Sequence, residues 1–164
     1  EGEIGFVYKG KMKYTIKKGR HYAAFTINRL FPFSSRSKEG SIKFSKECLE
    51  EGDISGWNKL TGIASAEIHK NSGRLVWRSN GNSIMISGYV YMNGVRREML
   101  ITSIDVDKWY DFSIEYSNKV WRFSVNGRQI LMSGYLPSNV LNFKCFPYFG
   151  GQSVAPQTMY VWVK

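Results

Sequence analysis

The sequence is poor in the residues that build metal sites, disulfide frameworks and nucleophile–base pairs. Its 164 residues contain two histidines, two cysteines and four prolines. A transition-metal site needs three or four clustered ligands, and scattered histidines and cysteines do not supply them. The motifs Gly-x-Ser-x-Gly and His-Glu-x-x-His and the phosphate-binding loop are absent as well. We therefore expect neither a metal nor another cofactor.

Long apolar runs are also missing. No stretch of about 18 apolar residues occurs, so the sequence predicts no transmembrane helix and no membrane partner. The two cysteines, Cys48 and Cys145, lie far apart in the chain. They allow one disulfide or two buried free thiols, and the spacing does not choose between them.

Acidic residues are scarce relative to basic ones, with 13 Asp and Glu against 23 Lys and Arg and a net charge of +10. Such a charge attracts polyanions: uronic-acid or sulfated polysaccharides, nucleic acids or anionic membranes. The alternative is a basic domain with no anionic partner. No nucleic-acid-binding motif is present, which argues against nucleic acid. The basic residues are spread along the chain, so only folding can gather them into a patch.

Helical periodicity is nearly absent, and about a dozen short strand-like segments fill the chain instead. Turn pairs such as Asn93-Gly94 and Asn126-Gly127 separate them. One or two helical turns are expected at 45–51, with Ser45 as a possible N-cap, inside an irregular segment at 32–56. The pattern predicts a single all-β domain, a sandwich or barrel, covering residues 1–164.

The segment 105–128 gives the strongest local signal, a β-hairpin with two alternating arms. Five apolar side chains of this hairpin are expected to share one buried cluster: Phe112, Ile114, Trp121, Phe123 and Val125. An acidic residue, Trp109-Tyr110, two alternating strands and Val-Asn-Gly together resemble the central hairpin of concanavalin A-like lectins and glucanases. That superfamily includes laminin-G-like domains, legume-type lectins and jelly-roll polysaccharide lyases.

The resemblance implies an all-β jelly-roll β-sandwich of two antiparallel sheets. The segment 146–163, with Tyr148-Phe-Gly-Gly and Ala155-Pro156, is similar to the closing strands of secreted bacterial jelly-roll proteins. This second resemblance implies a secreted, extracellular or cell-surface protein. Jelly-roll glycosidases of the superfamily carry Glu-x-Asp-x-x-Glu on one strand, and this sequence does not contain it.

Polysaccharide lyases of the superfamily use a His or Tyr base, a cation near the uronate and an amide that polarises its carboxyl. By residue type, the base could be His69 or Tyr148. The cation could be Arg78, and the amide could be Asn71 or Gln152. The signature strands of these lyases are not reproduced. If the chain is a lyase, His69, Arg78 and Tyr148 should lie within one sugar ring of each other. The plain structural alternative places Trp57 and Trp77 in the core, His69 in a loop and the arginines in solvent.

The segment 83–92 predicts a strand with two opposite faces. If Ile84, Ile86 and Val90 pack inward, Tyr89 and Tyr91 lie on an outer sheet face, where aromatic rings can stack on sugars. The proposed ligand-binding set lies on a concave face: Trp57, Asn71, Arg74, Tyr89, Tyr91 and Gln152. The sequence favours a non-catalytic, lectin-like domain for acidic polysaccharide. A polysaccharide lyase acting by β-elimination is the second hypothesis, and a plain structural module is the third.

Overall fold

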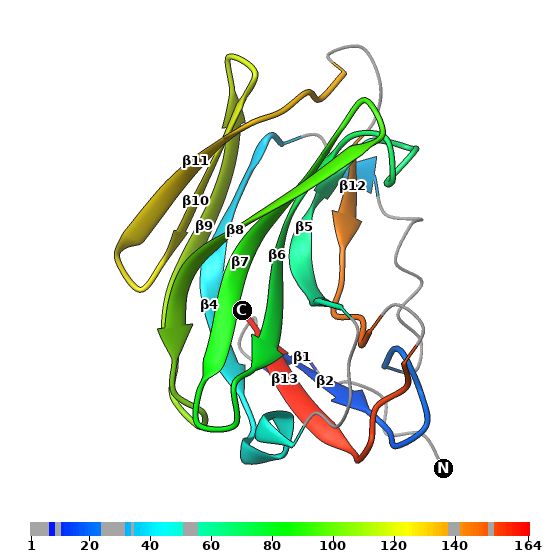
Figure 1. The fold of residues 1–164 in the computed structure, drawn as a ribbon, viewed down its shortest axis with the longest axis vertical. Helices are drawn as coiled ribbons and strands as arrows, with labels where there is room; N and C mark the ends of the chain where they lie inside the picture. Colours follow the sequence, from blue (N-terminus) through cyan, green and yellow to red (C-terminus); the bar gives the residue numbers. More distant parts are fainter. Residues whose placement is uncertain are drawn as a thin grey trace.

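Two antiparallel β-sheets face each other and hold all the strands of the described chain (Figure 1). The structure is a computed structural model that describes residues 7–8, 11–23, 32–33, 35–50, 56–137, 142–150 and 153–164. The predicted all-β sandwich of two antiparallel sheets is confirmed.

The first sheet has seven strands in the order β1-β2-β13-β4-β9-β10-β11. The last strand of the chain thus lies between two early ones, as in a jelly roll rather than a simple meander. The bounds in spatial order are β1 Val7–Tyr8, β2 Lys11–Ile16, β13 Met159–Val163, β4 Ser37–Phe44, β9 Tyr110–Ser117, β10 Val120–Val125 and β11 Arg128–Ser133.

The second sheet has six strands in the order β3-β12-β5-β6-β7-β8. Every neighbouring pair is antiparallel, and the register shifts once between β5 and β6 and once between β7 and β8. The bounds are β3 Pro32–Phe33, β12 Asn142–Cys145, β5 Asn58–Ala64, β6 Ser72–Ser79, β7 Ile84–Met92 and β8 Val95–Ile104.

The core lies between the sheets and contains the predicted hairpin cluster. Along β9 buried residues alternate with exposed or half-buried ones, and β10 shows the same alternation. All five side chains expected to share a cluster belong to the main core: Phe112, Ile114, Trp121, Phe123 and Val125. Period-two alternation was therefore sufficient to orient both strands.

Two turns take the backbone conformation that their residues predict. Asn93 and Gly94 have φ values of 50° and 82°, and Asn126 and Gly127 have 51° and 77°. Two successive positive φ values define the type I′ turn, which matches the right-handed twist of a hairpin. The predicted tight turns at both places are confirmed.

The described part of the segment 32–56 is more regular than its sequence suggests. A strand was expected only at Ser41–Phe44, but β4 begins at Ser37. Its first residues are polar and become a strand because they pair with β9, for example Glu39 with Ser113. The expected helical turn is a 3₁₀-helix, η1 Lys46–Leu49, whose N-cap residue Ser45 makes no side-chain cap bond.

Of the two cysteine alternatives, the structure has no disulfide: Cys48 and Cys145 are both buried as thiols. In the part of the chain that the structure describes, no helix has the length and apolar character needed to cross a membrane.

Candidate functional site

The outer face of the six-stranded sheet, which points away from the other sheet, carries the candidate site. Leu75 and Trp77 of β6 lie in the main core. The residues that alternate with them therefore point outward: Arg74, Val76 and Arg78. On β7, Tyr89 and Tyr91 take this same side, and a cluster separate from the core joins Trp57, Val76 and Tyr89. The predicted orientation of these side chains is confirmed, whereas their role in binding remains a prediction.

Arg74 is the unusual residue of this face. Only 5% of its surface is exposed, and its guanidinium lies 5.1 Å from the ring centre of Tyr89 and 5.9 Å from that of Tyr91. Among the described residues, its Nε and Nη2 atoms have no hydrogen-bond partner. A buried guanidinium without acceptors is costly, because its donors have lost water and gained only aromatic faces. The Nε and Nη2 donors of Arg74 are therefore buried and unused within the described residues.

The backbone beside Arg74 is shaped to hold its side chain. Gly62 of β5 pairs directly with Arg74, and a Cβ at Gly62 would overlap the Arg74 side chain. The arginine thus lies flat across the neighbouring strand instead of extending into solvent. A glycine is needed here for close approach, since the local sheet geometry leaves no room for a methyl group.

Two more cations gather around Arg74. Lys59 of β5 is partly buried, and its Nζ donates to the Trp57 carbonyl oxygen at 2.7 Å. Burial, helped by repulsion from Arg74 and Arg96, lowers the pKa of Lys59 to about 8. Arg96 of β8 donates to the hydroxyl of Tyr89 at 3.5 Å, and burial of Tyr89 raises the pKa of that hydroxyl.

The charge balance of this cluster is strongly positive. Glu98 of β8, which pairs with Tyr89, is the carboxylate that partly offsets the repulsion felt by Lys59. Three cations therefore surround two tyrosine rings with one carboxylate near them. An anion that bound here would relieve both the repulsion among the cations and the missing hydrogen bonds of Arg74.

Tyr148 joins the same face from the other side of β5. Its backbone exchanges two hydrogen bonds with Lys59, at 2.7 and 2.9 Å, so the two side chains lie on one side of the sheet. The Tyr148 ring stacks on His21, with 5.3 Å between ring centres and 5° between planes. The Nδ1 atom of His21 lies 3.0 Å from the Phe149 carbonyl oxygen. A carbonyl can only accept, so Nδ1 is the donor of this hydrogen bond.

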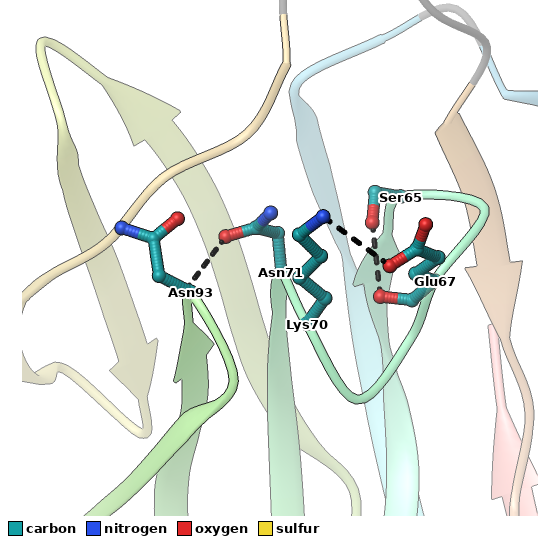
Figure 2. Close-up of polar contacts among 5 residues, drawn as sticks. All are labelled: Ser65, Glu67, Lys70, Asn71 and Asn93. Atoms are coloured by element: carbon teal, nitrogen blue, oxygen red, sulfur yellow. Dashed lines mark hydrogen bonds and ion pairs between the residues drawn. The ribbon is translucent and has the colours of Figure 1, made fainter.

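The loop between β5 and β6 carries two of the sequence candidates. Figure 2 shows that it is held by its own contacts: Ser65 Oγ donates to the Glu67 carbonyl at 3.0 Å, and Lys70 lies 3.5 Å from the Glu67 carboxylate. Asn71 is buried, and its side-chain oxygen accepts from the backbone N–H of Asn93 at 3.1 Å. The oxygen of Asn71 thus holds the β7–β8 turn, a structural task that the sequence did not suggest.

His69 lies in this loop, exposed, with its ring edge-on to Tyr91 at 5.4 Å. Arg78 lies near the opposite end of β6, exposed and 4.4 Å above the ring of Trp57. Six residues of strand separate Ser72 from Arg78, which is about 20 Å. The expectation that His69, Arg78 and Tyr148 lie within one sugar ring of each other is therefore wrong, because β6 holds two of them apart.

The structure instead places Tyr148 close to residues that the sequence did not single out. They are His21, whose ring stacks on Tyr148, and Lys59, whose backbone pairs with it, and no local motif connects the two. The one available signal was the scarcity of histidine, since His21 is one of two in the chain. Gln152, the remaining candidate, lies outside the described residues.

Comparisons with known proteins identify the fold. No protein-family model matches the sequence, and no curated protein matches it. Among solved structures, the alginate lyase AlyC3 superposes with a TM-score of 0.66 at 10% identity, covering 99% of this chain and 76% of that one. The alginate lyase A1-II', a member of polysaccharide lyase family 7, gives 0.62 at 11% identity and covers 99% and 81%.

A non-specific endo-β-1,3(4)-glucanase of glycoside hydrolase family 16, SCLam, gives a TM-score of 0.58 at 12% identity and covers 96% and 71%. Further structures of A1-II' hold a product and a substrate. These are jelly-roll proteins of the concanavalin A-like superfamily, so the chain has the concanavalin A-like jelly-roll fold that its hairpin suggested.

Proposed function

We propose that the outer face of the six-stranded sheet binds an acidic polysaccharide, with a sugar carboxylate at Arg74. The observation that supports this is the buried guanidinium whose Nε and Nη2 atoms have no acceptor. A carboxylate can receive two parallel hydrogen bonds from one guanidinium. A neutral sugar offers hydroxyl oxygens but no charge, so it would leave the repulsion between Arg74 and Lys59 in place.

The aromatic residues around Arg74 suit the rest of a sugar unit. Tyr89 and Tyr91 stand edge to face, 5.7 Å apart, and Trp57 belongs to the same cluster as Tyr89. Aromatic faces pack against the apolar faces of sugar rings, while the phenol hydroxyls supply hydrogen bonds. A polyuronate is a polymer of the cell exterior, and we propose that the protein acts outside the cell or at its surface.

The test compares Arg74→Met with Arg128→Met, which removes an exposed arginine at the β10–β11 turn and lowers the net charge equally. Methionine can replace a buried arginine without a stability loss, since it removes an uncompensated charge. In calorimetric titration with alginate oligosaccharides, we expect at least a tenfold affinity loss for Arg74→Met, the cost of about 1.4 kcal/mol or more. Arg128→Met should bind like the unaltered protein.

Equal affinities for the two variants would contradict the proposal, and so would equal binding of a neutral β-glucan by the unaltered protein. Unfolding measured by circular dichroism separates these results from misfolding, because both variants should unfold at or above the temperature of the unaltered protein.

A polysaccharide lyase is the second candidate function, favoured by the likeness to two alginate lyases and by the place of Tyr148. In β-elimination a base removes the C5 proton, the C4–C5 double bond forms, the C4–O bond breaks, and the leaving oxygen takes up a proton. Arg74 would neutralise the carboxylate beside C5, and Tyr148 would exchange protons with the sugar. The backbones of the two residues lie two strands and two residues apart, about 12 Å, a gap that both side chains reach into.

The lyase candidate is tested by the ultraviolet absorbance of the unsaturated product. We expect Tyr148→Phe to abolish product formation while oligosaccharide affinity changes less than threefold. Arg128→Met serves as the control and should leave the rate unchanged, because Arg128 is exposed at the start of β11 in the other sheet. If no unsaturated product forms from any uronate polymer, the lectin-like function stands alone.

A further inference from the structure

The outer face of the seven-stranded sheet carries a second set of aromatic and basic side chains, on the opposite side of the sandwich from the candidate site. Val161 and Val163 of β13 enter the core, so Trp162 between them points outward. The register pairs Trp162 with Lys13 of β2 on one side and Lys43 of β4 on the other.

These residues form a row of alternating cations and indoles. The Nζ atom of Lys43 lies 4.4 Å from the Trp162 ring and 5.2 Å from the Trp109 ring, and that of Lys13 lies 5.9 Å from Trp162. Tyr160, one outward position along β13, lies 4.3 Å from the Nζ atom of Lys13. We call Lys13, Trp162, Lys43 and Trp109 the Lys–Trp ladder.

The Lys–Trp ladder is not needed to close the core. On the inward face beside the ladder, Ile16, Phe44 and Val161 are buried in the core, and the ladder tryptophans are partly exposed on the other face. Outward positions of a solvated sheet are ordinarily polar. Large aromatic rings on an outer face, aligned across neighbouring strands, point to a binding surface.

The charges of the ladder indicate the kind of ligand. Within the described ranges, neither Lys13 nor Lys43 has a carboxylate partner or a hydrogen-bond acceptor, so the three N–H donors of each ammonium are available. The carboxylate on a neighbouring outward position, Asp111, accepts a hydrogen bond from Ser41 at 2.8 Å. The ladder therefore combines flat apolar rings with unused cations, a combination that fits a sugar chain bearing carboxylates.

We propose that the Lys–Trp ladder is a second binding surface for acidic polysaccharide, separate from the Arg74 site. Trp162 and Trp109 lie two strand spacings apart, about 10 Å, so the ligand must span more than one sugar unit. The two surfaces lie on opposite faces of the sandwich, and one protein molecule can hold two segments of polymer. Simultaneous attachment raises the effective affinity for a long chain without any new contact.

The experiment follows the indole N–H signals of the five tryptophans by NMR during titration with alginate oligosaccharides. Each signal is assigned with a single Trp→Phe variant. In an Arg74→Met background, which disables the first site, we expect the Trp162 and Trp109 signals to shift while Trp57 stays fixed. The double variant Lys13→Gln/Lys43→Gln should weaken this binding at least tenfold.

The control Lys119→Gln/Arg128→Gln removes two exposed charges from the β9–β10 and β10–β11 turns and should leave the ladder affinity unchanged. Trp162 and Trp109 signals that stay fixed at saturating oligosaccharide would overturn the proposal, even if Trp57 moves and the Arg74 site is real. Equal shifts with a neutral β-glucan would overturn the choice of an acidic ligand. If the Trp162 and Trp109 signals shift but the Trp57 signal stays fixed even in the protein with Arg74 intact, the ladder proposal is supported and the Arg74 site is contradicted.

Discussion

At the residue scale, the protein buries cations at positions where keeping them charged costs free energy. Arg74 is buried among tyrosines, and Lys59 is partly buried beside it, so each raises the cost of keeping the other charged. A stable fold tolerates such groups when something else depends on them, and binding an anion is the simplest such purpose. The cost should be visible in how stability and affinity depend on pH.

Lys59 gives the first such prediction. Its pKa in the folded state is about 8, below the ordinary lysine value of 10.5, so the unfolded chain binds more protons between these two values. The free energy of unfolding should therefore rise as pH increases through this window, and Lys59→Gln should flatten the rise. Denaturant titrations at several pH values measure it, and a rise of the same size in Lys59→Gln would assign the effect to other groups.

Ligand binding should show the opposite trend. A sugar carboxylate favours the charged form of Lys59, so affinity for an oligouronate should fall as pH rises through about 8. Lys59→Arg keeps the charge at every accessible pH and should remove this dependence between pH 7 and 9. An identical pH profile in the arginine variant would mean that Lys59 does not face the ligand.

At the scale of elements, one large side chain fills the space between the two sheets beside the candidate site. Trp121 of β10 is fully buried, and a Cβ added to Gly73 of β6 or to Gly134 would overlap its indole. Gly73 lies in the facing sheet and Gly134 directly follows β11 in the sheet of Trp121 itself, and both leave out a side chain where the indole fits. Because Gly73 directly precedes Arg74 in β6, this contact positions the candidate site.

Replacement of Trp121 by alanine should therefore be severe. We expect Trp121→Ala to lower the free energy of unfolding by about 3–5 kcal/mol, since the glycines around the indole have no side chains to fill the cavity. The exposed neighbour Arg122→Ala should cost no more than about 0.5 kcal/mol. Chemical denaturation measures both, and a Trp121→Ala loss below 1 kcal/mol would show that the sheets repack.

The same elements show what a sequence can predict. The β9–β10 hairpin was predictable because its alternation is local and each arm buries every second residue. The orientation of Arg74 was predictable for the same reason. Its burial was not, because Gly62, Tyr89 and Tyr91 come from two other strands. His21 stacks on Tyr148 because its neighbour Tyr22 pairs with Tyr148 in an isolated bridge. Sequence periodicity cannot predict a contact between residues so far apart in the chain.

At the scale of the whole molecule, the net charge of +10 is expressed on both outer faces, around Arg74 on one and along the Lys–Trp ladder on the other. Charge distributed in this way attracts a long polyanion from any direction and then offers aromatic surfaces to hold it. Affinity for polymeric uronate should consequently depend strongly on salt. Between about 0.1 M and 1 M ionic strength the screening length falls from about 10 Å to about 3 Å, shorter than the spacing of the cations on either face.

We expect the affinity for alginate to fall at least tenfold over this range, whereas any weak binding of a neutral β-glucan should change little, because stacking is not screened. Variants on each face separate the contributions of the two faces to the salt dependence. Arg74→Met and Lys13→Gln/Lys43→Gln should each make the salt dependence less steep, and their combination should make it less steep still. Affinity electrophoresis in gels of graded salt measures all four proteins side by side. An affinity that does not change with salt would mean that the aromatic rings alone bind the ligand. It would contradict the role of the sugar carboxylate in both proposals.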